Sequence, residues 1–375
     1  MKKVLIIGNS HDKHLTRFIK GLRTINVDYC IDILDVSMRQ DLCKNKELYN
    51  QVFVVRRTFP NYAYKLPVVS KYLKYLDTVR AFNSIACNYK LISIQFLTIQ
   101  AGFLFNVLKK YGAKLIVTPW GSDIYRIGYI QQWFTKRLIN KADYVTLMPN
   151  SKFGDYVKIK FSIPESKCIP LCFGSDVLDK IITDTKSKVE CKRELLGTND
   201  KFCIVVGYNA SSAQNHLKII EALSKIKKQL PSNTIILLPM TYAKVESYMQ
   251  QVKTKLDELG IEYQIYDSYL TDDEVVNLRK STDLFIHMQV TDAYSSSLQE
   301  TLICGQKVIN AEWLRYKELE LLGLPYRLAN FENLSASIIN ELNNERSFVD
   351  ISNVLKQYTW SYQLVEWNKL YNKYC

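Results

Sequence analysis

The segment from Asp283 to Asn310, DLFIHMQVTDAYSSSLQETLICGQKVIN, decides the fold that the sequence predicts. Its apolar run at 284–286 predicts a buried strand, and after a polar loop a helix is expected to open near Ser295. Gly305 ends that helix, and the apolar run at 307–309 predicts a second buried strand. Strand, helix and strand in this order form a βαβ unit, which builds a parallel sheet.

Two carboxylates flank the start of this predicted helix. Asp292 lies in the loop before it, and Glu300 lies inside it, with Ser295, Ser296 and Ser297 between them. A helix start has free backbone N–H groups and the positive end of the helix dipole, and small hydroxyl residues let a ligand approach. The segment therefore predicts a cradle for a phosphorylated sugar. In the alternative interpretation, Asp292 caps the helix and Glu300 is a solvated acid.

This pattern resembles the acidic-x7-acidic motif of retaining glycosyltransferases with two Rossmann-like domains, the GT-B fold, in the broad family that builds bacterial polysaccharides. The resemblance implies that Asp292 lies near the transferred sugar and that the helix start, Ser296 with Ser297, holds the diphosphate, with Ser295 beside them as a further donor-binding candidate. It also implies that Glu300 accepts the ribose hydroxyls. The first acid of that motif is usually Glu, and Asp292 is one methylene shorter.

Length and composition predict two domains without a membrane span. A chain of 375 residues suits two domains of Rossmann size, which we place at 1–178 and 201–357, with a linker at 179–200 and a terminal helix, 358–375, packing on the first domain. The longest apolar region, 91–108, is interrupted by polar residues and is too short to cross a bilayer. Nine cysteines without C-x-x-C spacing argue for a reducing compartment and against zinc or disulfides.

The net charge of +13 favours an anionic partner. In the stretch 56–80, Arg and Lys alternate with Phe and Tyr, a composition that suits an anionic membrane surface. Solvated basic faces that merely reflect composition are the alternative. The signatures of nucleic-acid binding are absent, so no nucleic-acid partner is expected. We therefore expect a cytoplasmic protein that is peripheral on the inner face of the cytoplasmic membrane.

The first domain is expected to open with a short buried strand, Val4–Gly8, a glycine turn and a helix, as Rossmann-like units do. His11 follows the turn, where it could reach a substrate or lie on the surface as a capping residue. Four further strands are expected, and their alternation with helices predicts a mostly parallel sheet. They lie at 29–34, 51–55, 91–95 and 114–118.

After the last of these strands, Trp120, Gly121, Ser122 and Asp123 stand at the sheet edge where open α/β sheets bind ligands. This W-G-S-D run is similar to one in some polysaccharide glycosyltransferases, where the loop faces the cleft between the domains. The similarity implies that Asp123 orients the acceptor hydroxyl or the donor sugar, beside an apolar wall formed by Trp120. The alternative is that Asp123 caps the next helix.

The second domain is expected to open with strand 202–206 and Gly207, followed by a polar loop that contains Asn209 and His216. Many relatives have an Arg and a Lys in this loop, and this chain has neither. Amides, hydroxyls and a protonated His216 are therefore expected to replace them around the diphosphate. Tyr269, after the strand 263–266, could stack on the nucleotide base or belong to the core.

The loop just described, with Leu238–Tyr242, also resembles the transferases that add acetamido-dideoxygalactose to a lipid-linked enterobacterial antigen. The D-x-D, H-E-x-x-H, G-x-S-x-G and Walker motifs are absent. We expect an α/β protein with two Rossmann-like domains facing across a cleft. The activity expected from the resemblance is retaining glycosyl transfer from a nucleoside diphosphate sugar.

The expected acceptor is a lipid-linked or polysaccharide molecule in capsule or O-antigen synthesis, and no cofactor or metal ion is expected. Asp292, Asp123 and His11 are the catalytic candidates. Two alternatives remain open: a non-hydrolysing sugar-nucleotide epimerase, and an accessory or binding protein of the same fold with a decayed site.

Overall fold

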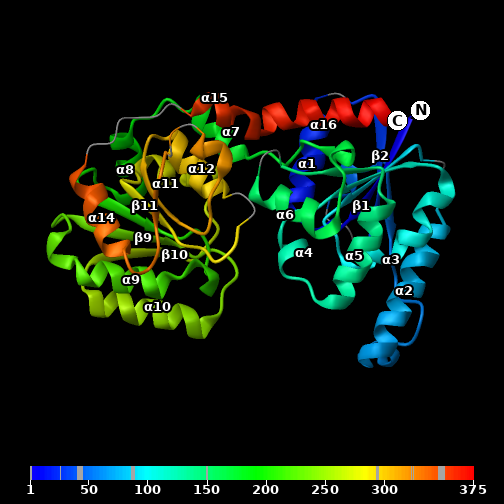
Figure 1. The fold of residues 1–375 in the computed structure, drawn as a ribbon, viewed down its shortest axis with the longest axis horizontal. Helices are drawn as coiled ribbons and strands as arrows, with labels where there is room; N and C mark the ends of the chain where they lie inside the picture. Colours follow the sequence, from blue (N-terminus) through cyan, green and yellow to red (C-terminus); the bar gives the residue numbers. More distant parts are fainter. Residues whose placement is uncertain are drawn as a thin grey trace. The chain divides into compact units, whose positions relative to one another are not determined.

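The computed structural model describes residues 2–25, 27–39, 45–85, 89–148, 151–292, 295–321, 323, 325–344 and 351–375. The chain forms two compact units. The first unit contains Met1–Phe173 together with Trp360–Cys375, and the second contains Gly174–Thr359. Both are α/β structures built on a parallel sheet, as predicted, and Figure 1 shows their strands and helices.

The sheet of the first unit has seven strands in the order β3-β2-β1-β4-β5-β6-β7, and its neighbouring strands are parallel. Its central strands are buried on both faces, which explains their nearly continuous apolar runs. The strands are β1 (Lys2–Gly8), β2 (Tyr29–Asp35), β3 (Gln51–Val54), β4 (Leu91–Gln95), β5 (Lys114–Thr118), β6 (Tyr144–Thr146) and β7 (Cys168–Ile169).

Helices cover both faces of this first sheet (Figure 1). On one face, α1 packs with the C-terminal helix α16, and the ring of Phe18 lies 5.1 Å from that of Trp367. On the other face, α3 contacts both α2 and α5. The helices are α1 (Lys13–Thr24), α2 (Pro67–Asn83), α3 (Ile99–Phe103), α4 (Ser122–Tyr125), α5 (Tyr129–Lys141), α6 (Lys152–Phe161) and α16 (Trp360–Tyr374).

The sheet of the second unit has six parallel strands in the order β10-β9-β8-β11-β12-β13. The segment that the sequence marked as decisive forms β11, α12 and β12, so the predicted βαβ unit is present. The strands are β8 (Phe202–Val206), β9 (Thr234–Pro239), β10 (Glu262–Tyr266), β11 (Leu284–His287), β12 (Lys307–Ala311) and β13 (Arg327–Ala329).

Two sets of helices cover the second sheet. On one face, α9 contacts α10 and α14, and on the other face α11 contacts α7, α8 and α12 (Figure 1). The helices are α7 (Asp176–Thr183), α8 (Lys188–Leu196), α9 (His216–Lys225), α10 (Glu246–Leu259), α11 (Asp272–Ser281), α12 (Ser296–Ile303), α13 (Lys317–Glu320), α14 (Leu334–Asn343) and α15 (Ser352–Leu355).

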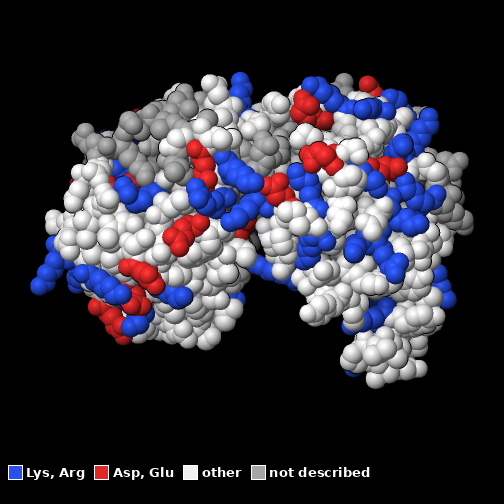
Figure 2. Space-filling view, in the orientation of Figure 1, with Lys and Arg blue, Asp and Glu red and all other residues white. Residues whose placement is uncertain are grey.

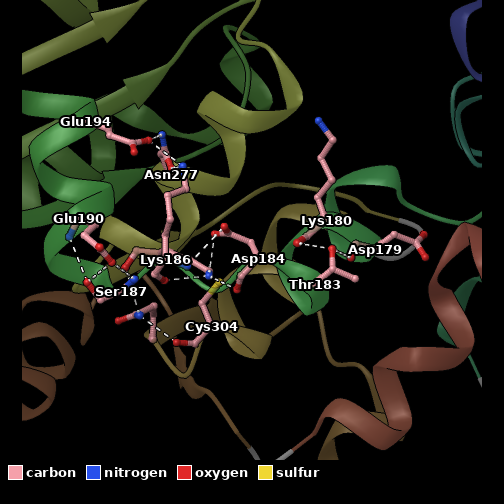
Figure 3. A network of polar contacts seen from close by, with 12 residues as sticks. Asp179, Lys180, Thr183, Asp184, Lys186, Ser187, Glu190, Glu194, Asn277 and Cys304 are labelled. Atoms are coloured by element: carbon pink, nitrogen blue, oxygen red, sulfur yellow. Dashed lines mark hydrogen bonds and ion pairs between the residues drawn. The ribbon is translucent and has the colours of Figure 1, made fainter.

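The segment 179–200, for which the sequence predicts a linker, contains most of α7 and all of α8. A capping box formed by Ser187 and Glu190 starts α8. Lys186 Nζ donates to Glu194 Oε2 and to Asn277 Oδ1 of α11, both at 2.7 Å (Figure 3). This polar network and the contacts between α8 and α11 attach the segment to the second unit.

Shorter turns of 3-10 helix connect several of these elements, among them η2 (Asn61–Lys65) before α2 and η6 (Ser212–Gln214) before α9. Within the described ranges, no helix combines the length and the apolar character that a membrane span requires.

Candidate functional site

In the second unit, two loops meet at the point where the strand order reverses. From β8 the chain continues to β9 on one side, and from β11 it continues to β12 on the other side. The loops after β8 and β11 therefore start at the carboxyl ends of neighbouring strands and run in opposite directions. This is the position at which open α/β sheets bind ligands. Val290 N–H donates to Ala213 O at 2.9 Å, and Asn215 Nδ2 donates to Met288 O at 2.7 Å.

Gly207 begins the first of these loops in a conformation that favours glycine. Its φ is 63°, and an added Cβ would lie 2.9 Å from His216 Nε2. His216 is therefore packed directly beneath the glycine turn, at the start of α9. Its Nδ1 lies 3.2 Å from the hydroxyl of Tyr248.

His216 is fully buried, and burial lowers its pKa to about 4. The imidazole is thus neutral at neutral pH, which corrects the expectation of a protonated His216 beside the diphosphate. Its place in the structure is under the loop, where it supports Gly207. Its predicted contact with the donor stays a prediction.

Asp292 lies in the second loop, after β11, and has two neighbours that the sequence did not reveal. Tyr208 donates its hydroxyl to Asp292 Oδ2 at 2.9 Å, and His287 Nε2 lies 3.6 Å from the same oxygen. Burial, and then the charge of Asp292, raise the pKa of Tyr208 well above its usual value, so the phenol stays a hydrogen-bond donor. The Asp292 carboxylate is thereby oriented at the switch point.

The helix α12 opens at Ser295, as the sequence predicts, and its N-cap is Ser295 rather than Asp292. The Ser295 hydroxyl accepts a hydrogen bond from the N–H of Leu298, while Ser296 is exposed and Ser297 is buried. The first N–H groups of a helix have no partner within the helix, so this start presents backbone donors and a positive dipole end. The arrangement suits an anion such as a diphosphate.

Glu300 is 4% exposed and forms a buried ion pair with Arg279 of α11. Arg279 Nε donates to Glu300 Oε2 at 3.0 Å, and its Nη2 donates to Ser297 Oγ at 2.7 Å. The other carboxylate oxygen accepts a hydrogen bond from Ser175 Oγ at 3.0 Å. Each oxygen therefore keeps one lone pair for a further donor.

Two tyrosines lie near parallel beside this site, after β9 and β10. The rings of Tyr242 and Tyr269 have centroids 6.3 Å apart with an interplanar angle of 6°, and both side chains are exposed. Asn209 Nδ2 donates to the Tyr242 hydroxyl at 3.4 Å, and its Oδ1 accepts from Ser211 N–H at 2.8 Å. Tyr269 is thus a surface aromatic rather than a core residue. The Asn209 side chain is engaged by hydrogen bonds to Tyr242 and to Ser211 of its own loop.

In the first unit, Asp123 is 1% exposed and binds backbone groups. Its Oδ1 accepts from the N–H groups of Trp120 (2.9 Å) and Gly121 (2.8 Å), and its Oδ2 accepts from Leu97 N–H (2.8 Å). Burial raises the pKa of Asp123, and these donors oppose that rise. The carboxylate shapes the loop before Ser122, and its predicted contact with substrate stays a prediction.

Trp120 and His11 lie near the carboxyl ends of β5 and β1. The Trp120 ring contacts Phe96, Phe173 and His14 edge to face, with centroids 4.8 to 5.8 Å apart. His11 is partly exposed, and its N–H donates to Asn9 Oδ1 at 3.0 Å. His11 therefore lies at the switch between β1 and β4, the ligand position of this sheet, and Trp120 follows β5, the strand beyond β4.

Sequence reasoning missed Tyr208, His287 and Arg279. Tyr208 and His287 had a usable signal, since His287 is the polar last residue of the buried strand β11 and Tyr208 follows the buried strand β8 directly after Gly207. Arg279 had none, because a cation in the last turn of a helix is usually solvated. Among the described residues, no group of three or more His, Cys, Asp and Glu side chains is arranged to hold a metal ion.

These two Rossmann-like units define the GT-B fold of glycosyltransferases, and comparison with solved structures confirms it. Sucrose-phosphate synthase from Thermosynechococcus elongatus is 12% identical, with a TM-score of 0.74, and the match covers 100% of this chain and 99% of that chain. A glycosyltransferase from Rickettsia africae is 16% identical, with a TM-score of 0.71 and coverage of 99% and 98%.

HepE from Anabaena, solved with UDP and glucose, is also 16% identical, with a TM-score of 0.69 and coverage of 100% and 99%. At these identities the likeness establishes the fold alone. No protein-family model matches the chain.

One curated protein, uroporphyrinogen decarboxylase from Rickettsia massiliae, is 28% identical over an alignment of 181 positions, and the match covers 43% of this chain. The matched part spans about half of that relative, 47% of its length. A match of this extent establishes no family and carries no activity over to this chain.

Proposed function

We propose that this chain is a retaining glycosyltransferase that moves a sugar from a nucleoside diphosphate sugar to a lipid-linked or polysaccharide acceptor in cell-surface glycan synthesis. The observation that carries the proposal is the α12 site. Asp292 and Glu300 flank a helix start at the switch point of the second sheet. The HepE neighbour of the same fold was solved with UDP and UDP-glucose, so UDP is the first donor nucleotide to test.

In the proposed donor complex, the free lone pairs of Glu300 accept the ribose hydroxyls, and Arg279 holds the carboxylate in place. The backbone N–H groups at Ser296 and Ser297 donate to the diphosphate. Tyr269 stacks on the base, beside Tyr242. Asp292, oriented by Tyr208, accepts hydroxyls of the transferred sugar.

During transfer, the bond between sugar C1 and the diphosphate oxygen breaks, and its electron pair leaves with the diphosphate. The acceptor oxygen forms a bond to C1 on the same face and gives its proton to the leaving oxygen. The donors at the start of α12 are aimed at the charge that develops there, which is the largest usual contribution to such catalysis. Backbone amides supply this stabilisation without any further group.

The proposal is tested by transfer of labelled sugar from a panel of UDP-sugars to extracted lipid and glycan acceptors. Asp292→Asn should slow transfer roughly tenfold to hundredfold, because a hydrogen bond to a charged group contributes about 1.5 to 3 kcal/mol. Asp267→Asn, an exposed position in the same unit, is the matched control and should leave the rate unchanged. Absence of transfer with every nucleotide sugar would contradict the proposed activity.

We also place the protein at an anionic membrane surface. The α2 apolar patch consists of Tyr62, Leu66, Val68, Val69 and Tyr72, all exposed, with Val68 82% exposed. Exposed Lys65 and Lys71 lie within this patch along the chain. Apolar side chains bordered by cations are the composition of an interfacial segment. On the face shown in Figure 2, Lys and Arg side chains are spread over the first unit.

Sedimentation with vesicles tests this placement. Val68→Asp/Val69→Asp should lose binding to phosphatidylglycerol vesicles, and the fold should survive because acidic residues are favourable in the first turn of α2. Val189→Asp/Val245→Asp removes two exposed valines from the second unit and should bind as the wild type does. Equal sedimentation of both double variants would contradict the membrane placement.

A further inference from the structure

A basic groove runs along the edge of the first unit's sheet, over the edge strand β3. Its volume is about 920 Å³, within the range of small-molecule sites. Four cations line it, Arg39 and Lys46 from the connection before β3 and Arg56 and Arg57 directly after it. The described residues that line the groove include no Asp or Glu.

The charges of this groove are not neutralised by the described part of the chain. All four cations are exposed, and none forms an ion pair with a described carboxylate. The guanidinium of Arg57 lies over the ring of Tyr64, 5.1 Å from its centroid. Like charges gathered in a concave surface repel one another, and an anion removes that repulsion when it binds.

The loop that carries Arg56 and Arg57 is held in place by the buried carboxylate of Asp77. Asp77 is 1% exposed and accepts hydrogen bonds from Tyr64 Oη and from Thr58 N–H, the latter at 3.3 Å. The backbone that carries Arg56 and Arg57 is therefore held in place by hydrogen bonds to Asp77. Such preorganisation lowers the entropy lost on ligand binding.

Apolar side chains share the groove with these cations. Val52 and Val54 are two residues apart on β3, so their side chains point to the same face of the strand, and both line the groove. Along the chain, the groove residue Asn61 is followed at once by Tyr62 of the α2 apolar patch. The groove therefore combines phosphate-binding charge with an apolar wall and continues into the proposed membrane surface.

We propose that this groove binds the diphosphate group of a lipid-anchored acceptor. The inference rests on the proposed function and names the acceptor class. β3 lies two and a half strand spacings, about 12 Å, from the switch between β1 and β4. An acceptor that spans this distance carries at least one sugar on its diphosphate. An earlier reaction must therefore supply it, by joining a sugar phosphate to a lipid phosphate or a sugar to a lipid diphosphate.

Binding of farnesyl diphosphate, measured by calorimetry in the presence of saturating UDP, tests the groove. Arg39→Gln/Lys46→Gln should weaken binding at least about tenfold, since two contacts between cations and phosphate are lost. Lys228→Gln/Lys253→Gln removes the same charge from exposed positions of the second unit and should bind as the wild type does. Inorganic pyrophosphate should compete with farnesyl diphosphate.

Three outcomes would overturn the inference: equal binding by both double variants, no competition by pyrophosphate, or binding of farnesyl diphosphate that is seen in a parallel titration without UDP and is lost with saturating UDP. The last outcome would assign the diphosphate to the nucleotide site instead. Stabilisation by UDP, measured on the same samples, separates the two proposals. If UDP stabilises the groove variant as it does the wild type, a failure of farnesyl diphosphate binding overturns the groove alone.

Discussion

Breaking the buried pair of Arg279 and Glu300 is expected to destabilise the second unit strongly. Both side chains are 6% exposed, and their closest atoms, Nε and Oε2, are 3.0 Å apart. Arg279→Met removes the guanidinium but keeps most of the apolar stem, so Glu300 is left as a buried charge without its cation. Loss of one partner from a buried pair costs about 3 to 5 kcal/mol.

For a unit of this size, that loss lowers the midpoint of thermal unfolding by about 6 to 20 °C. The double variant Arg279→Met/Glu300→Gln should recover more than half of the loss, because neither charge remains buried alone. Lys180→Met is the matched control. It breaks the exposed pair of Lys180 with Asp273, also between α11 and a neighbouring helix, and should cost less than about 1 kcal/mol.

Denaturant titration and calorimetry of these three variants measure the differences directly. A loss for Arg279→Met no larger than that for Lys180→Met would refute the reasoning, since the pair would then be solvated. The absence of recovery in the double variant would refute it as well, because the loss would then come from packing rather than from an unpaired charge.

Further predictions concern the loops at the switch point and the stacked tyrosines. The pKa of His216, lowered by burial from 6.5 to about 4, means that the unfolded chain binds a proton that the folded protein excludes. Stability should therefore fall by about 3 kcal/mol as the pH drops from 6.5 to 4, and a His216→Asn variant that keeps this pH dependence would contradict the assignment. Gly207→Ala places a Cβ against His216 and should lower the free energy of unfolding by at least about 1 kcal/mol more than Gly197→Ala, whose Cβ meets nothing within 4 Å. Equal losses of unfolding free energy, measured in denaturant, would show that the loop relaxes freely. Tyr269→Ala should weaken UDP binding, measured by calorimetry, about tenfold, because stacking contributes about 1 to 3 kcal/mol per base. Tyr129→Ala in the first unit is the control and should bind UDP as the wild type does. Unchanged affinity for UDP in both variants would remove Tyr269 from the site.

Strand positions were largely predictable from the sequence because buried parallel strands are continuous apolar runs that end in glycine or polar residues. The predicted strand at 202–206 coincides with β8, and that at 284–286 falls one residue short of β11. His287 is the missing residue. It is polar and yet fully buried, since its Nδ1 lies 2.8 Å from Asn310 Oδ1 on the neighbouring strand.

Helices with little apolar content were harder to predict. The helix α8 lies in a lysine-rich segment whose polar residues form a capping box and bonds to α11, and those partners are distant in sequence. Likewise, nothing local to Asp123 indicates that its carboxylate accepts a hydrogen bond from Leu97. The ion pair of Arg279 with Glu300 could not be predicted either, because the two residues belong to different helices, α11 and α12, which come together only in the folded chain.

The proposed donor site is tested most directly by a calorimetric titration of UDP into the wild type, Glu300→Gln and Glu341→Gln. Glu341 is the matched control, a buried acid of the same unit that pairs with Arg327 away from α12. We predict that Glu300→Gln binds UDP roughly tenfold to hundredfold more weakly, because a charged acceptor for the ribose is lost, and that Glu341→Gln binds as the wild type does. Equal affinity for UDP in all three proteins, or no binding to the wild type, would contradict the proposed site.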